Sequence, residues 1–179
     1  MSAPVTTTRV LLVGLMASGK SAVGQAVAAA SGWPALDNDA LLERSTGSSA
    51  VELLASHGIE RLRAAESDVL TLTLSMPGPL VAGVAAGVVL DARDRGRLTA
   101  GGHVVYLRTP VAVLVRRVTR KDHRPFLRGD AAATLKAMAA ERDPLYVEVA
   151  DQVLDMSALT PAQAARSVLA AVGGPAVTG

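Results

Sequence analysis

The stretch GLMASGKS, Gly14–Ser21, combines residue types at a spacing that suits phosphate binding. It fits the pattern G-x-x-x-x-G-K-[ST], in which glycines let the backbone wrap closely around an anion and point its N–H groups at a β-phosphate. Lys20 would then neutralise the β- and γ-phosphate oxygens, and the Ser21 hydroxyl would be a ligand of Mg²⁺. The alternative interpretation is an ordinary glycine-rich turn with an exposed lysine.

The residues on either side of this stretch favour the phosphate loop. The run RVLLV before it is apolar and β-branched, which is typical of a strand covered on both faces of a parallel sheet. The run SAVGQAVAAASG after it predicts a helix with Val23 and Val27 on one face and Gly32 as its cap. A buried strand before the loop and a helix after it are the context that the pattern requires.

A pair of carboxylates follows a second strand-like run, in the stretch LDNDALLE. Asp37 and Asp39 would lie at the carboxyl end of that strand, beside the phosphate loop of a doubly wound sheet. One would help to hold the hydration shell of Mg²⁺, and the other would orient an acceptor hydroxyl for attack. Asp39 could also cap a helix that begins at Ala40, and capping is compatible with either role.

Strand-like and helical stretches alternate along the chain, which predicts an α/β fold with a five-stranded parallel sheet and helices on both faces. We expect one domain over residues 1–179, with frayed ends at residues 1–8 and 173–179. The expected strands are Arg9–Gly14, Pro34–Asp37, Pro79–Val84, His103–Leu107 and Gln152–Asp155.

The segment RKDHRPFLRGD, residues 120–130, interrupts this alternation with a high density of charge. It could be a solvated surface loop. A basic, mobile segment after the fourth strand is also what a phosphoryl-transfer site needs as a lid, because the site must close over its nucleotide and exclude water.

The composition limits the classes of partner. Half of the residues are apolar and only 2% are aromatic, so the core must be built from Ala, Val and Leu. The net charge is +2 and the arginines are scattered, which favours small anionic ligands over nucleic acid. Cysteine is absent, no signal peptide is recognisable, and the longest apolar run is shorter than the about 20 residues that span a bilayer. We therefore expect a cytoplasmic protein without membrane partners.

Five motifs in this order and spacing resemble those of the shikimate kinases: GLMASGKSAVG, LDNDALLE, TGSSAVELLASHGIERLRAAE, HRPFL and ERDPLYVEVAD. The resemblance covers nearly the whole chain. It implies a P-loop kinase that uses ATP and Mg²⁺ to phosphorylate the 3-hydroxyl of shikimate, in aromatic amino-acid biosynthesis. There are two alternatives. The acceptor could be another small hydroxy acid, such as gluconate, or the chain could be a nucleotide-binding protein with little turnover. We expect a monomer.

The resemblance also implies roles for individual residues. Lys20, Asp39 and the lid arginine Arg124 would be catalytic, and Ser21 and Asp37 would support the metal. The residues implied in ATP binding are Gly14, Ala17, Ser18, Gly19, Lys20, Ser21, Ala22, Arg117, Arg124 and Pro161. Those implied in substrate binding are Asp39, Arg63 (braced by Glu66), Ala85, Ala86, Gly87 and Arg142, with the two arginines as carboxylate clamps.

The chain departs from the family pattern around the acceptor. Shikimate kinases have a Gly-Gly-Gly turn after the third strand, where this chain has Ala85, Ala86 and Gly87. Alanine would be strained there if the turn needed a positive φ, and its methyl groups would narrow the site. Leu54 and Leu62 replace phenylalanines of the acceptor pocket, and Phe126 replaces a lid leucine. The charged residues of the family are all retained.

Overall fold

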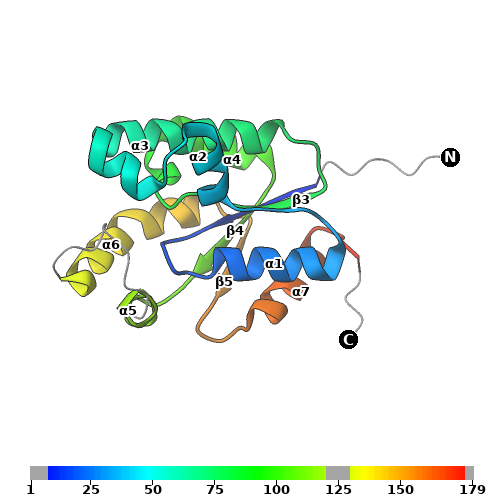
Figure 1. The fold of residues 1–179 in the computed structure, drawn as a ribbon. Coiled ribbons are helices and arrows are strands. Elements are labelled where there is room, and N and C mark those ends of the chain that lie inside the picture. Colours follow the sequence, from blue (N-terminus) through cyan, green and yellow to red (C-terminus); the bar gives the residue numbers. More distant parts are fainter. Residues whose placement is uncertain (1–7, 120–129, 176–179) are drawn as a thin grey trace.

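A computed structural model describes residues 8–119 and 130–175 of the chain. It contains one parallel sheet in the order β2-β3-β1-β4-β5. Figure 1 shows this sheet between two layers of helices. The predicted α/β fold is confirmed, and the predicted strands agree with the observed ones to within one residue at each end. The strands are β1 (Arg9–Val13), β2 (Ala35–Leu36), β3 (Leu80–Gly83), β4 (His103–Arg108) and β5 (Gln152–Asp155).

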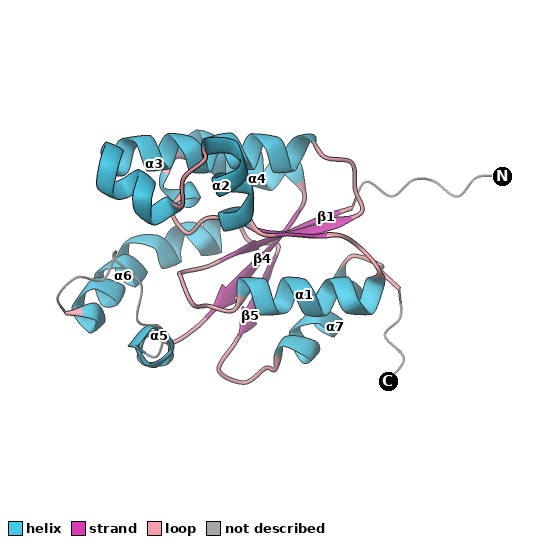
Figure 2. Ribbon diagram, viewed as in Figure 1, coloured by secondary structure: helices cyan, strands magenta, loops and turns pink. Residues whose placement is uncertain are grey.

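Helices cover both faces of the sheet (Figure 2). Two of them, α1 and α7, pack on one face, and α3 to α6 pack on the other. The helices are α1 (Lys20–Ser31), α2 (Asn38–Thr46), α3 (Ala50–Ser75), α4 (Ala92–Gly101), α5 (Val111–Thr119), α6 (Ala131–Val149) and α7 (Pro161–Ala171), with a 3₁₀ turn, η1, at Val88–Leu90. Among the described residues, no helix is both long enough and apolar enough to span a membrane.

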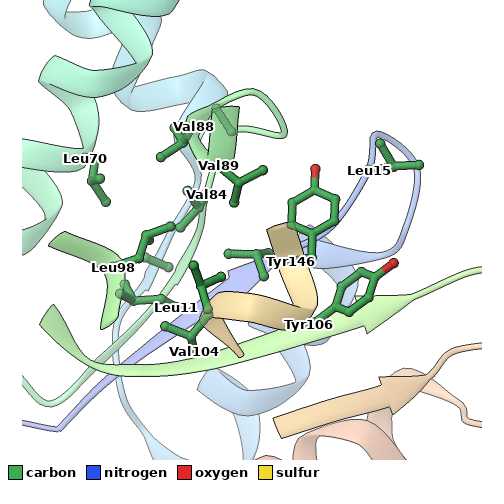
Figure 3. Packing of buried hydrophobic residues seen from close by; sticks show 14 of the residues in the cluster. Leu11, Leu15, Leu70, Val84, Val88, Val89, Leu98, Val104, Tyr106 and Tyr146 are labelled. Atoms are coloured by element: carbon green, nitrogen blue, oxygen red, sulfur yellow. The ribbon is translucent and has the colours of Figure 1, made fainter. Parts of the chain in front are cut away.

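Alternate residues of the central strands supply the two halves of the core. On β1, Val10 and Leu12 face α1 and α7, whereas Leu11 and Val13 face the other helices. Figure 3 shows the second cluster, in which aliphatic side chains surround Tyr106 and Tyr146. Val, Leu and Ala dominate both clusters, as the composition predicts. Burial on both faces explains why the central strands are continuously apolar.

The sheet brings the carboxyl ends of its strands to one edge, and the loops that follow them build the site. Helix α1 begins directly after the loop that leaves β1, and its left-handed C-cap is Gly32, as predicted. Its Val23 and Val27 are both fully buried on one face. The predicted lid, apart from Asp130, and most of the predicted frayed ends lie outside the described residues.

Candidate active site

The loop between β1 and α1 has the backbone geometry of a tight anion-binding turn. Gly14 has φ 148° and Gly19 has φ 105°, and both values favour glycine. A Cβ on Gly14 would also lie 2.8 Å from Ser18 Oγ and 3.0 Å from the Leu107 carbonyl oxygen. Glycine is therefore required at position 14 for two reasons: its φ is positive, and there is no space for a Cβ.

Ala17 is the one non-glycine residue in the described part of the chain with a positive φ, 63°. This left-handed conformation costs an L-residue about 1–2 kcal/mol. Arg117, on α5, donates a hydrogen bond of 2.9 Å from Nη1 to the Ala17 carbonyl oxygen. Strain in the loop is thus offset in part by a contact from a residue on the other side of the same cleft.

Lys20 and Ser21 form the first turn of α1. Lys20 Nζ donates to the carbonyl oxygens of Gly14 and Leu15, at 2.8 and 3.0 Å, so its ammonium lies over the loop. Ser21 Oγ donates to Asp37 Oδ2 at 3.1 Å. A hydroxyl and a carboxylate oxygen at this spacing are the hard donors that Mg²⁺ takes together with water and phosphate oxygens. In the described residues, no cluster of three or more His, Cys, Asp or Glu side chains offers a complete protein cage for a metal.

Asp37, and not Asp39, caps helix α2. Asp37 Oδ1 accepts hydrogen bonds from the backbone N–H groups of Asp39 and Ala40, at 3.0 and 3.1 Å. The prediction that Asp39 caps a helix from Ala40 is therefore wrong by two residues. Asp37 uses one oxygen for the cap and turns the other to Ser21, so capping fixes the direction of this carboxylate, while the Asp39 side chain stays exposed.

The acceptor side contains a buried cluster of opposite charges on α3 and α6. Arg63 Nη1 donates to Glu66 Oε2 at 2.5 Å. Burial raises the pKa of Glu66, and the positive charges of Arg63 and then Arg142 oppose that rise, while the charge of Asp39 adds to it. These four residues are therefore close enough to interact electrostatically, which is what two clamps and an orienting carboxylate around one ligand require.

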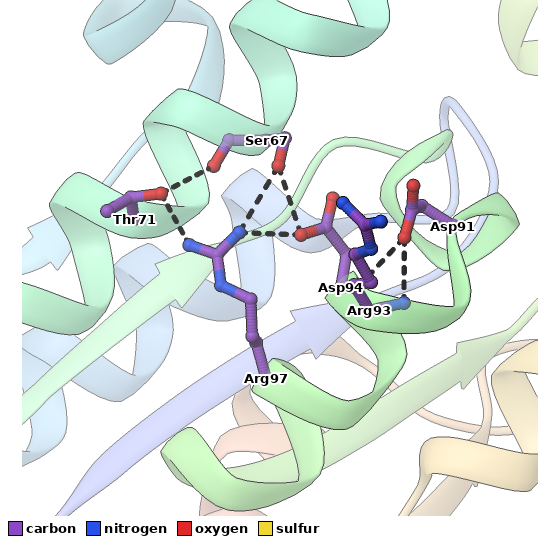
Figure 4. A network of polar contacts seen from close by, with 6 residues as sticks. All are labelled: Ser67, Thr71, Asp91, Arg93, Asp94 and Arg97. Carbon is purple, nitrogen blue, oxygen red and sulfur yellow. Dashed lines mark hydrogen bonds and ion pairs between the residues drawn. The ribbon is translucent and has the colours of Figure 1, made fainter.

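Helix α3 is held in place directly behind this cluster by a polar network that reaches α4 (Figure 4). The buried Asp94 accepts hydrogen bonds from Ser67 Oγ at 3.0 Å and from Arg97 Nη1 at 2.6 Å. Arg97 Nη2 donates to Thr71 Oγ1 at 2.5 Å. Because Ser67 follows Glu66 in the same helix, this network fixes the rotation and height of the segment that carries Arg63.

The turn of Ala85–Gly87, which we call the acceptor turn, follows β3 and lies between Arg63 and α6. Neither Ala85 nor Ala86 has a positive φ, so the alanines are accommodated without backbone strain. Ala85 is buried in the core cluster, whereas Ala86 is half-exposed. A Cβ on Gly87 would overlap the Arg63 guanidinium. The third glycine of the family pattern is therefore retained at the position where space demands it.

The carbonyl oxygen of Ala86 is bound from α6. It accepts a hydrogen bond from Tyr146 Oη at 2.8 Å and a longer one from Arg142 Nη1 at 3.5 Å. Arg142 is buried, with 5% of its surface exposed, and its Nε also contacts Glu141 Oε2 at 3.4 Å. Arg142 therefore projects from the core toward the acceptor turn.

One cleft of about 1220 Å³ joins these parts. Its volume exceeds the roughly 300–1,000 Å³ of a pocket for one small ligand, which suits a site for two substrates. With the exception of Gly14 and of the two expected wall residues Leu54 and Leu62, every described residue that we predicted for the site lines it. They are Ala17, Ser18, Gly19, Lys20, Ser21, Ala22, Asp37, Asp39, Arg63, Ala85, Ala86, Gly87, Arg117, Arg142 and Pro161. Arg124 lies outside the described residues.

One end of the cleft is formed by α5 and the start of α7. Arg117 and Pro161 both line it, together with Met156 and Leu159. Pro161 is the first residue of α7, behind a capping box of Thr160 and Gln163 that fixes where the helix begins. A guanidinium and a proline ring at this place offer flat surfaces to a planar base.

The structure corrects the expected acceptor walls. Leu62 is fully buried in a hydrophobic cluster between α2 and α3, and Leu54 packs against that cluster; neither lines the cleft. Residues that sequence reasoning missed stand there instead, among them Glu43, Val51 and Met138. Glu43 follows Asp39 by four residues on α2, and that helical spacing is a signal that could have found it.

Comparison with known proteins agrees with this geometry. The family model described as shikimate kinase matches residues 16–173. The chain is 39% identical over 155 residues to a shikimate kinase of Xanthomonas axonopodis, covering 86% of each chain. It is 38% identical over 170 residues to one of Halorhodospira halophila, covering 94% of this chain and 96% of the relative. The structure of the Acinetobacter baumannii shikimate kinase in complex with shikimate superposes with a TM-score of 0.88 at 32% identity, covering 94% of both chains. The chain belongs to the shikimate kinase family.

Proposed function

We propose that the protein transfers the γ-phosphate of ATP to the 3-hydroxyl of shikimate, giving shikimate 3-phosphate and ADP. The observation that carries this proposal is the convergence of Arg63, Arg142 and Asp39 on the same cleft as the phosphate loop. A guanidinium bonds both oxygens of a carboxylate, so two arginines select an acid. The carboxylate of Asp39 supplies an acceptor for a hydroxyl of the same ligand.

The nucleotide would lie along the phosphate loop with its adenine between Arg117 and Pro161. The N–H groups of the loop and the Lys20 ammonium would surround the β- and γ-phosphates. Ser21 and Asp37 would hold Mg²⁺, directly and through water respectively, and that ion supplies charge neutralisation at the phosphates when bound. Arg124, by family resemblance, would reach the transferring phosphoryl group from the lid.

In the proposed reaction, the acceptor oxygen forms a bond to the γ-phosphorus as the bond from that phosphorus to the β,γ-bridging oxygen breaks. ADP leaves in line with the attacking oxygen. Asp39 accepts the hydrogen bond of the attacking hydroxyl, orients it and takes up its proton as the new bond forms, from where the proton passes to solvent. Arg63, braced by Glu66, and Arg142 hold the carboxylate. Positioning and electrostatic stabilisation supply most of the catalysis, because the protein forms no covalent intermediate.

ADP release measured with shikimate and with a panel of sugar acids that includes gluconate tests this proposal. We expect turnover with shikimate, dependent on Mg²⁺, and little with the other acids. Turnover with a different hydroxy acid alone would show that the acceptor is misassigned. ATP binding without turnover of any acceptor would favour a nucleotide-binding protein, although the retained acidic and basic residues of the acceptor side speak against it. The monomeric state and the cytoplasmic location stay predictions.

A further inference from the structure

We propose that the Tyr146 hydroxyl is a positioning group for acceptor binding, because it fixes the peptide between Ala86 and Gly87. The proposal rests on the proposed function and extends it to a residue outside the cleft. Tyr146 is fully buried and does not line the cleft, so it would not touch a ligand. It acts, in this view, only through the backbone of the acceptor turn.

The first step concerns the direction of one N–H group. The peptide from Ala86 to Gly87 is trans and planar, so the Gly87 N–H points opposite to the Ala86 carbonyl. Tyr146 Oη binds that carbonyl at 2.8 Å from the α6 side. Holding the oxygen toward α6 therefore turns the Gly87 N–H away from α6.

This N–H is available to a ligand. Among the residues that the structure describes, neither the Ala86 nor the Gly87 amide donates a hydrogen bond to a protein acceptor. Both residues line the cleft. An N–H group at the cleft wall, beside a guanidinium, is suited to bind a carboxylate oxygen. The strength of that hydrogen bond depends on how well the direction of the N–H is fixed.

The second step concerns Arg142. Tyr146 and Arg142 are four residues apart on α6, so they lie on the same face of the helix and both reach the Ala86 carbonyl. The tyrosine bond is the shorter by 0.7 Å, from 3.5 to 2.8 Å, so Tyr146 satisfies this oxygen. The peptide is consequently held mainly by Tyr146, and Arg142 adds a longer, weaker hydrogen bond.

The third step concerns why this tyrosine is rigid. The chain has only two tyrosines, and their rings stack with centroids 5.0 Å apart (Figure 3). Burial raises the pKa of Tyr146, so its hydroxyl remains a donor throughout the neutral range. The hydroxyl of the second ring, Tyr106, donates instead to Asp143 Oδ1 at 2.8 Å, and among the described residues no hydrogen bond joins it to the turn. The two stacked phenols thus differ in the group that each hydroxyl binds.

That difference supplies a matched experiment. Tyr146→Phe keeps the ring and removes the hydroxyl, and we expect the KM for shikimate to rise about tenfold, the equivalent of one lost hydrogen bond, with the KM for ATP unchanged. Tyr106→Phe removes the other hydroxyl, and we expect it to leave the KM for shikimate within about twofold of the parent value. Equal changes in both variants, or none in either, would overturn the proposal.

Amide hydrogen exchange over residues 84–90 gives a readout that needs no acceptor. We expect faster exchange there in Tyr146→Phe and parental exchange in Tyr106→Phe, because only the first variant releases the turn. This readout separates the two proposals. If the unsubstituted protein does not turn over shikimate, the proposed function is refuted. If amide exchange in Tyr146→Phe is as slow as in the unsubstituted protein, the role of Tyr146 is refuted. Unfolding followed through Trp33, which packs on the opposite face of the sheet, reports whether each variant is folded.

A conservative replacement tests the hydrogen bond itself. When Tyr146 is replaced by 4-aminophenylalanine, an N–H donor stands where the hydroxyl was, and we expect the KM for shikimate to return to within about twofold of the parent. This variant also serves if Tyr146→Phe does not fold. A KM that stays raised in the folded amino variant would show that packing, and not the hydrogen bond, accounts for the effect.

Discussion

The guanidinium of Arg63 occupies the space where a side chain on Gly87 would begin. Gly87 has φ −90° and ψ −13°, which any residue adopts, so glycine is needed here only because Arg63 lies against it. The contact joins the first clamp to the acceptor turn. Arg63 is held from its other side by Glu66, and its side chain is only 27% exposed. Its position is thus determined by packing as well as by charge.

Gly87→Ala should therefore displace Arg63 and weaken acceptor binding without affecting the nucleotide. We expect kcat/KM for shikimate to fall by about 10- to 100-fold, as for one lost charge-assisted hydrogen bond of about 1.5–3 kcal/mol. The KM for ATP should not change. Gly96→Ala is the control, because a Cβ on Gly96, in helix α4, meets no atom within 4 Å. Equal activity of the two variants would mean that Arg63 can leave Gly87 at no cost.

Arg63→Lys keeps the positive charge and removes the fork that binds two oxygens at once. We expect a large rise in the KM for shikimate, of about tenfold or more, with little change in the KM for ATP. Arg61→Lys is a suitable control, since Arg61 is exposed on the same helix. If both KM values of Arg63→Lys equal those of the parent, Arg63 is not a carboxylate clamp.

Lys20→Ala should abolish tight binding of MgATP and leave the fold intact. The ammonium lies over the carbonyl oxygens of Gly14 and Leu15 at the surface of the cleft, so its loss removes charge and no core packing. Calorimetric titration with MgATP measures the effect, and the circular dichroism spectrum checks the fold. Lys136→Ala, at an exposed position of α6, is the control. Retained affinity in Lys20→Ala would contradict the assignment of the phosphate loop.

Glu66 links the stability of the fold to pH. Burial raises the pKa of Glu66 in the folded state above the ordinary value of a glutamate, so the folded protein binds this proton more tightly than the unfolded chain does. The contribution of this proton to the free energy of unfolding is fully present below the pKa that Glu66 has in the unfolded chain. It is lost as the pH rises through the higher pKa that Glu66 has in the folded protein. Between about pH 4 and 7, the free energy of unfolding of the parent should therefore fall relative to that of Glu66→Gln. Urea unfolding at several pH values measures this difference.

Glu66→Gln removes the destabilising buried charge, but we expect it to bind shikimate more weakly. A neutral amide braces Arg63 less strongly than a carboxylate, so the KM for shikimate should rise in Glu66→Gln. A parallel pH dependence in the two proteins would show that Glu66 does not carry the linkage. An unchanged KM would show that Arg63 needs no brace.

The sequence allowed good prediction of the sheet and of the phosphate loop, because apolar runs, glycines and the Lys-Ser pair are local signals. Capping was harder to predict, since Asp37 and Asp39 are both good caps and only the backbone angles of Asp37, φ −100° and ψ 124°, decide between them. Leu54 and Leu62 could not be placed from spacing alone, because whether a leucine faces a ligand or α2 depends on how two helices meet. Tyr146 was missed although it is one of only two tyrosines and follows Arg142 by four residues.

The acceptor turn offers the sharpest test of how this chain departs from its family. Both alanines line the cleft, but Ala85 is only 9% exposed and belongs to the core, whereas Ala86 is no member of the core clusters. The two alanines should therefore respond differently to replacement by glycine. Ala85→Gly should lower the free energy of unfolding by about 1 kcal/mol, through lost burial and added chain entropy. Ala86→Gly should affect stability less and widen the site.

We accordingly expect Ala86→Gly to raise shikimate turnover, or at least not to lower it, and Ala85→Gly to act mainly on stability. Steady-state kinetics and urea unfolding of both single variants and of the double variant measure the two effects. If Ala86→Gly loses activity while the unsubstituted protein is fully active, the Ala86 methyl group is part of the acceptor pocket and the narrower pocket favours acceptor binding. The methyl would then add apolar contact to the ligand, and the hydrogen bond from Tyr146 Oη to the Ala86 carbonyl would be what holds that methyl in place.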